Sequence, residues 1–469
     1  MTDILDLPGW KVTGTRREDG EYLIDAEYTI QPDSCQKCGV VGNLYRHGTK
    51  PVNYIDSPLR GEPTRLVAKV RRYKCRECGE TFLQPLAGIL ADRRITERCS
   101  NFIAYRCLSQ TFTRIAEDVG CDDKTVRTLA GDFIAKLEAA YQPQLPEWLG
   151  IDETQIDGEM RCVITDLGNK QPVDMLRDRS KASVISWLSK YRDRSVVKGV
   201  ATDMWRPYRE VTHMMLPGVP LVVDKFHVVR MANYCMERVR IRLQKTKKAV
   251  VRRDWLQSKH ILNLRASGLT EKQRFNRDMW LDNEPELAVA YKLKEDFYAI
   301  YEMSKAEATL AFDAYAEEVP TELKHDFKVL LTAMKNWREG ILAFFDYPIT
   351  NAYTESLNRV AKEINRAGRG YSFEVLRARV LFGKRVKDKT WSVISHSDTS
   401  VMAIQAYLEL NGNQCQCCGK EFDAKDSMGR PIMALLGRGQ QQQRVVICAY
   451  CFSYFHTGNT ISSMPLSTH

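Results

Sequence analysis

A short apolar run that ends in an acid, Trp148-Leu-Gly-Ile-Asp152, most constrains how this chain can fold. Its pattern predicts a buried strand, and a second acid, Glu153, follows at once. A carboxylate on a buried strand is costly unless it binds a cation or another partner. The alternative is an ordinary acid in a surface turn. The two interpretations differ in whether later segments bring further carboxylates to the same place.

The segments after this strand are predicted to form a hairpin, a crossover helix and one more strand, at 160–167, 171–176, 184–191 and 196–203. This order is that of a ribonuclease H-like core, in which the first and fourth strands are neighbours. Asp203 ends the fourth strand, so we expect it beside Asp152. A later helix supplies Glu355 as a third acid, with Asn351 and Asn358 on the same helical face.

Fourteen cysteines include four pairs with the spacing C-x2-C. Three of these pairs are followed directly by Gly, as a tight loop around a tetrahedral thiolate site favours. The pairs predict two zinc ribbons, with the Zn²⁺ ligands Cys35, Cys38, Cys75 and Cys78 in the first and Cys415, Cys418, Cys448 and Cys451 in the second. Disulfides are the alternative, but nothing in the sequence indicates export, and reducing compartments oppose them.

A helical pattern covers residues 91–142, and the span 112–127 within it matches a helix-turn-helix. Gly120 permits the turn between the two helices. An ordinary helical hairpin is the alternative, but the strand predicted at 64–73 has a basic face, which favours DNA binding. The side chains expected in a DNA groove are Lys124, Thr125, Arg127 and Thr128.

Formal net charge is +10, and eight Lys and Arg residues lie between Glu237 and Asp254 with no acid among them. Such a cluster predicts a polyanionic partner, although a solvated helical face is the alternative. The cations assigned to DNA phosphates are Arg238, Arg240, Arg242 and Lys245. The sequence has no apolar run of about 18 residues and no signal-peptide pattern, so we expect a soluble, intracellular protein without a membrane partner.

Together these patterns predict a multidomain chain of the α+β and α/β classes. Residues 249–345 have no strand pattern and are rich in Leu, Ala, Glu, Lys and Arg, which predicts an all-helical insertion. The expected order is an N-terminal zinc ribbon, a helix-turn-helix, a ribonuclease H-like core split by the insertion, the last helix of that core, and a C-terminal zinc ribbon, at 1–90, 91–142, 147–248, 346–390 and 411–460.

These features resemble the DDE transposases of the ISL3 type of bacterial insertion sequences. The resemblance covers about residues 30–390 and rests on the first cysteine set, the helix-turn-helix, and the motifs Gly150-Ile-Asp-Glu, Thr202-Asp-Met-Trp, Val223-Asp-Lys-Phe-His-Val and Asn351-x3-Glu355-x2-Asn358-Arg. It implies the catalytic triad Asp152, Asp203 and Glu355. The cysteine set after Leu410 is not typical of the family.

Three carboxylates a few ångströms apart favour the hard cations Mg²⁺ or Mn²⁺. Two such ions can activate water or a 3′-hydroxyl and stabilise the leaving oxygen, which is DNA strand cleavage and strand transfer. The resemblance implies that the substrates are the element's terminal inverted repeats and target DNA. It also implies a homodimer or larger homo-oligomer in the bacterial cytoplasm, associated with the nucleoid.

Several alternatives stay open at this point. Asp224 and His227 are assigned either to the active site, with Asn351 and Asn358 as further support, or to a structural role at a strand end. A metal-dependent nuclease would share the core but would not need a sequence-reading segment before it. A retired transposase that acts as a sequence-specific DNA-binding regulator would tolerate a broken triad, whereas all three acids are present here.

Overall fold

The structure is a computed structural model, and the residues that it describes are 7–90, 92–247, 255, 258–393, 421, 431–436 and 443–448. The chain divides into two compact units, residues 1–383 and 384–469. In the second unit, β11 (Pro431–Leu436) and β12 (Gln443–Cys448) pair antiparallel. The second zinc ribbon stays a prediction, because three of its four ligands lie outside the described residues: Cys415, Cys418 and Cys451.

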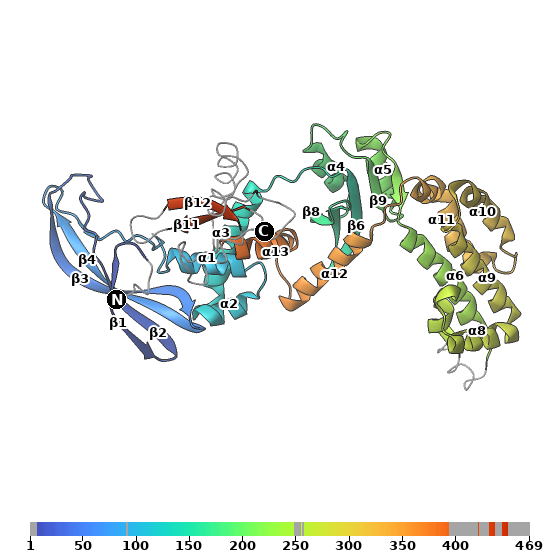
Figure 1. Cartoon of the computed structure of the whole chain (residues 1–469), viewed down its shortest axis with the longest axis horizontal. Coiled ribbons are helices and arrows are strands. Elements are labelled where there is room, and N and C mark those ends of the chain that lie inside the picture. Colours follow the sequence, from blue (N-terminus) through green and yellow to red (C-terminus); the bar gives the residue numbers. More distant parts are fainter. Residues whose placement is uncertain are drawn as a thin grey trace. The chain divides into compact units, whose positions relative to one another are not determined.

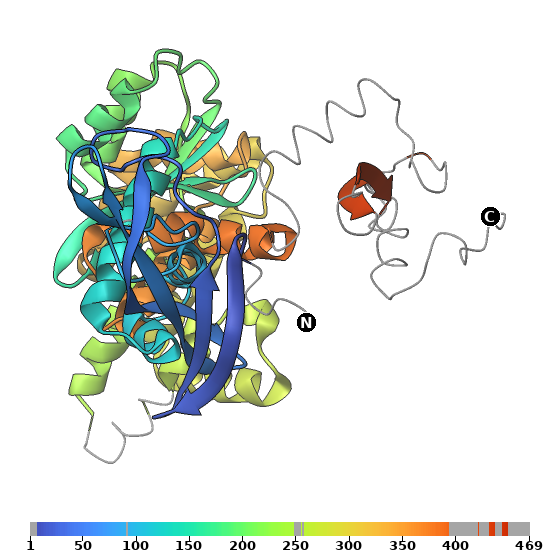
Figure 2. The same ribbon diagram turned by 90° about the vertical axis from the view of Figure 1, so that its left-hand side faces the viewer.

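The first unit begins with a five-stranded sheet, whose long strands are the dark blue ribbons facing the viewer in Figure 2. In chain order its strands β1 to β5 span Trp10–Glu18, Glu21–Tyr28, Leu44–Leu59, Glu62–Cys75 and Thr81–Leu83. The strand order is β1-β2-β4-β3, with β5 also paired to β4. Leu66, Ala68 and Val70 of β4 are buried at alternate positions, as the pattern predicted. The first half of β3 is exposed and shows no such alternation, and the sequence analysis did not predict this strand.

Three helices follow, α1 (Glu97–Arg106), α2 (Phe112–Val119) and α3 (Asp123–Ala140). Gly120 ends α2 in the left-handed region, with φ of +71°. Asp122 caps α3, since its side chain accepts a hydrogen bond from the Thr125 N–H at 2.7 Å. The two helices and the short turn therefore lie where the sequence predicted them.

A second sheet carries the strand order β10-β9-β6-β7-β8. In chain order its elements are β6 (Trp148–Ile156), β7 (Glu159–Asp166), β8 (Gln171–Leu176), α4 (Lys181–Ser189), β9 (Gly199–Thr202), α5 (Arg206–Met215) and β10 (Leu221–Val223). The strands β6, β7 and β8 are antiparallel, whereas β9 and β10 run parallel to β6. The first and fourth strands are neighbours, which is the order that a ribonuclease H-like core requires.

The next part of the chain is helical, with no strand among its described residues from 255 to 345. In chain order its helices are α6 (Lys225–Lys245), η1 (Ala266–Gly268), α8 (Glu271–Asn283), α9 (Pro285–Ile300), α10 (Lys305–Glu318), α11 (Lys324–Leu342) and η2 (Ala343–Phe345). In Figure 1, α6 lies beside α9 and α11, and these helices share one apolar core. No helix in the described part of the chain combines the length and the hydropathy needed to cross a membrane.

The sequence predicted one last helix for residues 346–390, whereas the structure has two. They are α12 (Ala352–Ala367) and α13 (Phe373–Val393). The helical pattern breaks between them because Arg369 and Gly370 have φ of +54° and +92°. Apolar side chains of both helices pack on the sheet, in a cluster with Val163 and Met175. The helices α4 and α5 pack in a different cluster, with Leu149 and Ile151 of β6.

Candidate active site

The register of the second sheet brings three acids to one level. Ile151 of β6 pairs with Thr202 of β9, and Thr202 pairs with Val223 of β10. Each of these three residues is followed in the chain by an acid, namely Asp152, Asp203 and Asp224 respectively. Since the three strands are parallel, these acids start from the same edge of the sheet. The register of β6 and β9 thus places Asp203 beside Asp152, as the sequence analysis predicted.

Asp152, Glu153 and Asp203 form a first cluster, in which one carboxylate oxygen from each lies within 4.8 Å of the others. Asp152 is 5% exposed, and burial together with the nearby Asp203 raises its pKa to about 7. Burial and the charge of Glu153 raise the pKa of Asp203 to about 6. Two oxygens, Asp203 Oδ1 and Glu153 Oε2, are buried without a hydrogen-bond partner among the described residues. Such an all-oxygen cluster fits a hard divalent cation.

Asp224, His227 and Glu355 form a second cluster within the same distance limit. The carboxylate of Asp224 is fully buried and lies 3.2 Å from His227 Nδ1, which lies 3.7 Å from Glu355 Oε1. The hydrogen bond to Asp224 raises the pKa of His227. Protonated His227 in turn opposes part of the rise in the pKa of both Asp152 and Asp203. The predicted triad is therefore divided between two clusters that are coupled through His227.

Three asparagines, seven residues apart, fasten α12 to the β6–β7 hairpin. Asn351, Asn358 and Asn365 share one helical face, and their amide groups donate at 2.8 to 3.1 Å to Ile151 O, Asp152 Oδ2 and Asp157 Oδ1 respectively. Glu355 lies on the same helix, one turn after Asn351, so these bonds fix the position of its backbone. The sequence analysis named the first two asparagines and missed Asn365, although the seven-residue spacing was visible.

Gly150 allows the first turn of α12 to approach β6. A Cβ atom at this position would lie 2.7 Å from Oγ1 of Thr354 and 2.8 Å from Oδ1 of Asn351. Both groups are already engaged, because the Thr354 hydroxyl lies 2.6 Å from that of Thr165 and donates to Asn351 Oδ1 at 2.5 Å. Any larger residue at position 150 would therefore displace the turn that carries Glu355.

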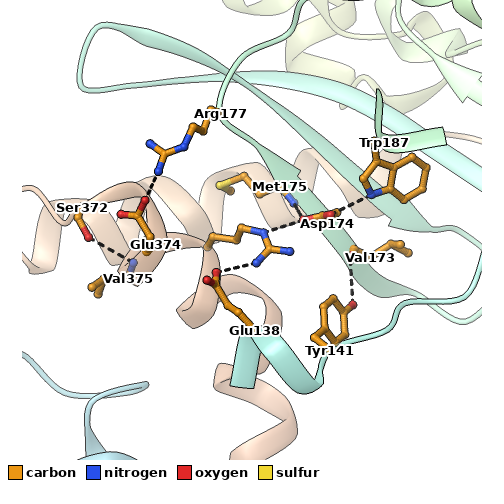
Figure 3. Close-up of polar contacts among 11 residues, drawn as sticks. Glu138, Tyr141, Val173, Asp174, Met175, Arg177, Trp187, Ser372, Glu374 and Val375 are labelled. Carbon is orange, nitrogen blue, oxygen red and sulfur yellow. Dashed lines mark hydrogen bonds and ion pairs between the residues drawn. The ribbon is translucent and has the colours of Figure 1, made fainter. Parts of the chain in front are cut away.

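A buried acid away from both clusters, Asp174 on β8, links the sheet to α3 and α13 (Figure 3). Its carboxylate accepts hydrogen bonds from Trp187 Nε1 at 2.9 Å and from Arg377 Nε at 2.8 Å. Arg377 also donates to Glu138, near the end of α3, at 2.7 Å. The hydroxyl of Tyr141, directly after α3, donates to the Val173 carbonyl at 2.8 Å. These bonds fix the end of α3 to the sheet that carries the acids.

Arg240 corrects one prediction about phosphate contacts. Its side chain is 2% exposed, so it is not part of a solvated basic face. It donates to both carboxylate oxygens of Glu237 at 2.7 Å and to the Trp255 carbonyl at 2.9 Å. An arginine that is buried with these protein partners cannot reach DNA, and the prediction of a phosphate contact at Arg240 is wrong.

The charges of Arg238 and Arg242 are compensated by acids of other helices. Arg242 forms ion pairs with Asp326 of α11 at 2.9 Å and with Glu286 of α9 at 2.6 Å. Arg238 lies 3.6 Å from Asp326 as well. The sequence showed a cluster without acids because Asp326 and Glu286 are 84 and 44 residues away from Arg242. Phosphate contacts by Arg238, Arg242 and Lys245 stay predictions.

The predicted DNA-reading residues lie in the first two turns of α3. Lys124 and Arg127 are exposed, and the Arg127 guanidinium lies 5.8 Å from the centre of the Phe112 ring. Thr125 is part of the helix cap, since its hydroxyl donates to Asp122 Oδ2 at 3.1 Å. Lys124 and Arg127 are therefore exposed to an outside partner, with Arg127 also 3.9 Å from the carboxylate of Asp123, whereas the Thr125 hydroxyl is used in the cap.

The first cysteine set forms one site, with the four Sγ atoms within 4.8 Å of one another. The distances Cys35–Cys78 and Cys38–Cys75 are both 3.8 Å. A tetrahedral zinc site with Zn–S bonds of about 2.3 Å has S–S edges of about 3.8 Å, so the four thiols fit one zinc ion. The N–H of Cys38 lowers the pKa of Cys35, which favours the thiolate that zinc binds.

Comparison with known proteins connects these two sites. Residues 149–380 match a family model for transposases of the ISL3 type, and residues 31–78 match a model for the zinc-finger of the transposases IS204, IS1001, IS1096 and IS1165. The transposase for insertion sequence element IS1001 of Bordetella parapertussis is 24% identical to this chain over 386 residues. This alignment covers 78% of the chain and 93% of that relative. The first match contains both acidic clusters, and the second contains the four cysteines.

Proposed function

The chain belongs to the ISL3 family of transposases, and from this we propose that it binds the terminal inverted repeats of an insertion sequence and catalyses metal-dependent cleavage and transfer of DNA strands. The proposed catalytic acids are Asp152, Asp203 and Glu355, on a core of the ribonuclease H-like type. The sheet register carries the proposal, because it aligns Asp152 with Asp203 and brings Asp224, with His227 and Glu355, to the same edge. Since both substrates are DNA, the proposed place of action is the nucleoid.

Five of the six residues in the two clusters have a proposed task. Asp152, Asp203 and Glu355 would hold Mg²⁺ or Mn²⁺, which supplies activation of the attacking oxygen and stabilisation of the leaving oxygen. Asn358 orients Asp152 through its 2.8 Å hydrogen bond to Oδ2. Asp224 holds His227 through Nδ1 and favours its protonated form, which would place a positive charge beside the acids where a phosphate would enter.

The N-terminal part has the features expected for DNA recognition. The proposed helix-turn-helix of α2 and α3 exposes Lys124 and Arg127, and the zinc ribbon before it has a basic face on β4. The end of α3 is fixed to the catalytic sheet through the bonds around Asp174. A DNA end bound by α3 would thus be held in a defined position relative to the acids.

Substitution of single acids tests the proposal. We expect Asp152→Asn, Asp203→Asn and Glu355→Gln to abolish cleavage of element-end DNA in Mg²⁺ while binding of the same DNA persists, because metal ligands are lost and phosphate contacts are not. The matched control is Glu363→Gln, an exposed acid on the same helix as Glu355, which should cleave normally. If Asp203→Asn cleaves normally, Asp203 is not the second acid and Asp224 takes its place.

A further inference from the structure

The exposed face of α12 carries a row of cations that no feature described above explains. Arg359, Lys362 and Arg366 lie three or four residues apart, and Arg369 follows in the turn after the helix. This spacing places them on one face of the helix. All four side chains are exposed, and within the described part of the chain none lies in an ion pair with an acid. We call these four residues the α12 basic row.

The α12 basic row starts at the proposed active site. Glu355 lies four residues before Arg359, one turn earlier on the same face of the helix. The asparagines that bind the β6–β7 hairpin are buried, whereas the cations of the row are exposed, so the bonds that hold α12 leave these cations open to an outside partner. From Glu355 to Arg366 the helix rises about 16 Å, at about 1.5 Å per residue. This length corresponds to about five nucleotide steps measured along the axis of a DNA duplex, at a rise of about 3.4 Å per step.

The other end of the α12 basic row lies at the predicted DNA-reading helices. Arg369 and Arg127 line a shared cavity of about 330 Å³ between the turn after α12 and the start of α2 and α3. Contact between the rings of Tyr371 and Phe112, with centroids 5.6 Å apart, holds the turn against α2. The guanidinium of Arg379 lies 4.1 Å from the centre of the Tyr371 ring and also donates to the Gln110 carbonyl. The row therefore connects Glu355 with the neighbourhood of Arg127.

We propose that the α12 basic row and Arg127 bind the sugar-phosphate backbone of duplex DNA between the proposed active site and α3. Uncompensated cations in a row are complementary to a regularly spaced polyanion, and phosphate contacts set the position of a duplex without reading its sequence. This inference rests on the proposed function, since it assigns a path to the same DNA. It moves the main phosphate contacts from α6, where acids compensate the arginines, to α12.

A purely structural role makes a different prediction. Cations in the last turn of a helix interact favourably with its dipole, and Arg366 lies in that turn. If this were the whole role of the row, neutral substitutions would lower the melting temperature and leave DNA affinity unchanged. Binding measurements at several salt concentrations separate the two roles, because each lost phosphate contact reduces the salt dependence.

The test uses the full chain with Asp203→Asn, so that binding is measured without cleavage. The row variant combines Arg359→Gln, Arg366→Gln and Arg369→Gln, and the control variant removes three exposed cations of the helical insertion by Lys272→Gln, Arg274→Gln and Lys328→Gln. The affinity for element-end and random duplexes is measured by fluorescence anisotropy at four salt concentrations. We expect the row variant to lose about 2.7 from the slope of log K against log salt on both duplexes, about 0.9 per contact. The control variant should keep the parent slope.

Other results would overturn the inference. It fails if the row variant keeps the parent slope or if the slope of the control variant falls by as much. A single-stranded RNA of equal length is measured alongside the duplexes, and the inference also fails if the row variant loses slope only on this RNA. Arg366→Lys keeps the charge and should keep the slope, and thermal unfolding of each variant checks that it is folded. If the parent does not prefer element ends to random duplex, the proposed function fails. If the parent prefers element ends but the row variant keeps the parent slope, only the proposal about the row fails.

Discussion

The helices α6 and α12 both carry many cations, yet their charges have opposite surroundings. On α6, Arg240 is buried with Glu237, and Arg242 pairs with acids of α9 and α11. On α12, the cations are exposed, while the polar groups of the buried face that bind β6 are neutral amides. The difference teaches that charge density along a sequence does not locate a polyanion site. The partners that compensate a helix are contributed by the elements packed against it.

The largest expected effect is the loss of the buried cation on α6. Arg240→Met should lower the free energy of unfolding by about 3 to 5 kcal/mol, because the mostly buried Glu237 would lose both hydrogen bonds to Arg240 and keep only Lys259, at 3.9 Å, as an ion partner. Urea denaturation measures this. Arg366→Met on α12 is the matched change on an exposed face and should stay within about 0.5 kcal/mol of the parent. Equal losses in the two variants would remove the distinction between the helices.

A second effect contrasts the buried acids that each helix contacts. Asp326 has arginines of α6 as partners, whereas the α12 partner of Asp152 is the neutral Asn358. The pKa of Asp152 is about 7 in the folded protein, against an ordinary value of 3.8, so the native state binds more protons between these two pH values. Stability of the metal-free protein should therefore fall as pH rises from 4 to 7, by at most about 4 kcal/mol from this group.

Asp152→Asn should remove most of that decline, since the amide does not ionise. Thermal unfolding from pH 4 to pH 8 in a chelator measures it for parent and variant. A variant with the same decline as the parent would show that Asp152 is not the titrating group. Saturating Mg²⁺ should raise the melting temperature of the parent more at pH 8 than at pH 5, because protons compete with the metal for the same carboxylate.

A smaller effect is expected on the buried face of α12. Asn358→Leu removes the donor to Asp152 Oδ2 and should cost about 1 to 3 kcal/mol of stability. Asn365→Leu removes an equivalent bond to Asp157, farther from the acids, at a similar cost. Only the first variant should also weaken Mn²⁺ binding, measured by titration calorimetry. If both weaken it equally, the asparagines act together on the whole helix and not on Asp152 alone.

The smallest effect concerns the partly exposed pair on α6. Arg242→Gln should cost about 1 kcal/mol or less, because the side chain is 43% exposed and solvent screens its ion pairs. The cost should shrink in 1 M salt, whereas that of Arg240→Met should persist, since a buried pair is screened much less. Denaturation at two salt concentrations compares them. A salt-independent loss at Arg242 would place it with Arg240.

Local patterns predicted the parts of the site that depend on neighbouring residues in the sequence. The apolar run before Asp152 and the short strand before Asp203 specify the register, and the C-x2-C spacing predicted the first zinc site. No pattern in the sequence indicated that Glu153 would join the first cluster, since this depends on the local direction of β6. The burial of Arg240 also depends on helix packing, which no short window of sequence contains.

The aligned register at Ile151, Thr202 and Val223 also makes the site sensitive to changes in chain length. Side chains alternate between the faces of a strand, so adding or removing one residue within β9 would turn Asp203 to the opposite face. Because β9 has four residues and β10 has three, neither strand has length to absorb such a shift, unlike the loops around them. A gene of this kind can therefore be silenced by one inserted or deleted codon that leaves every acid in place.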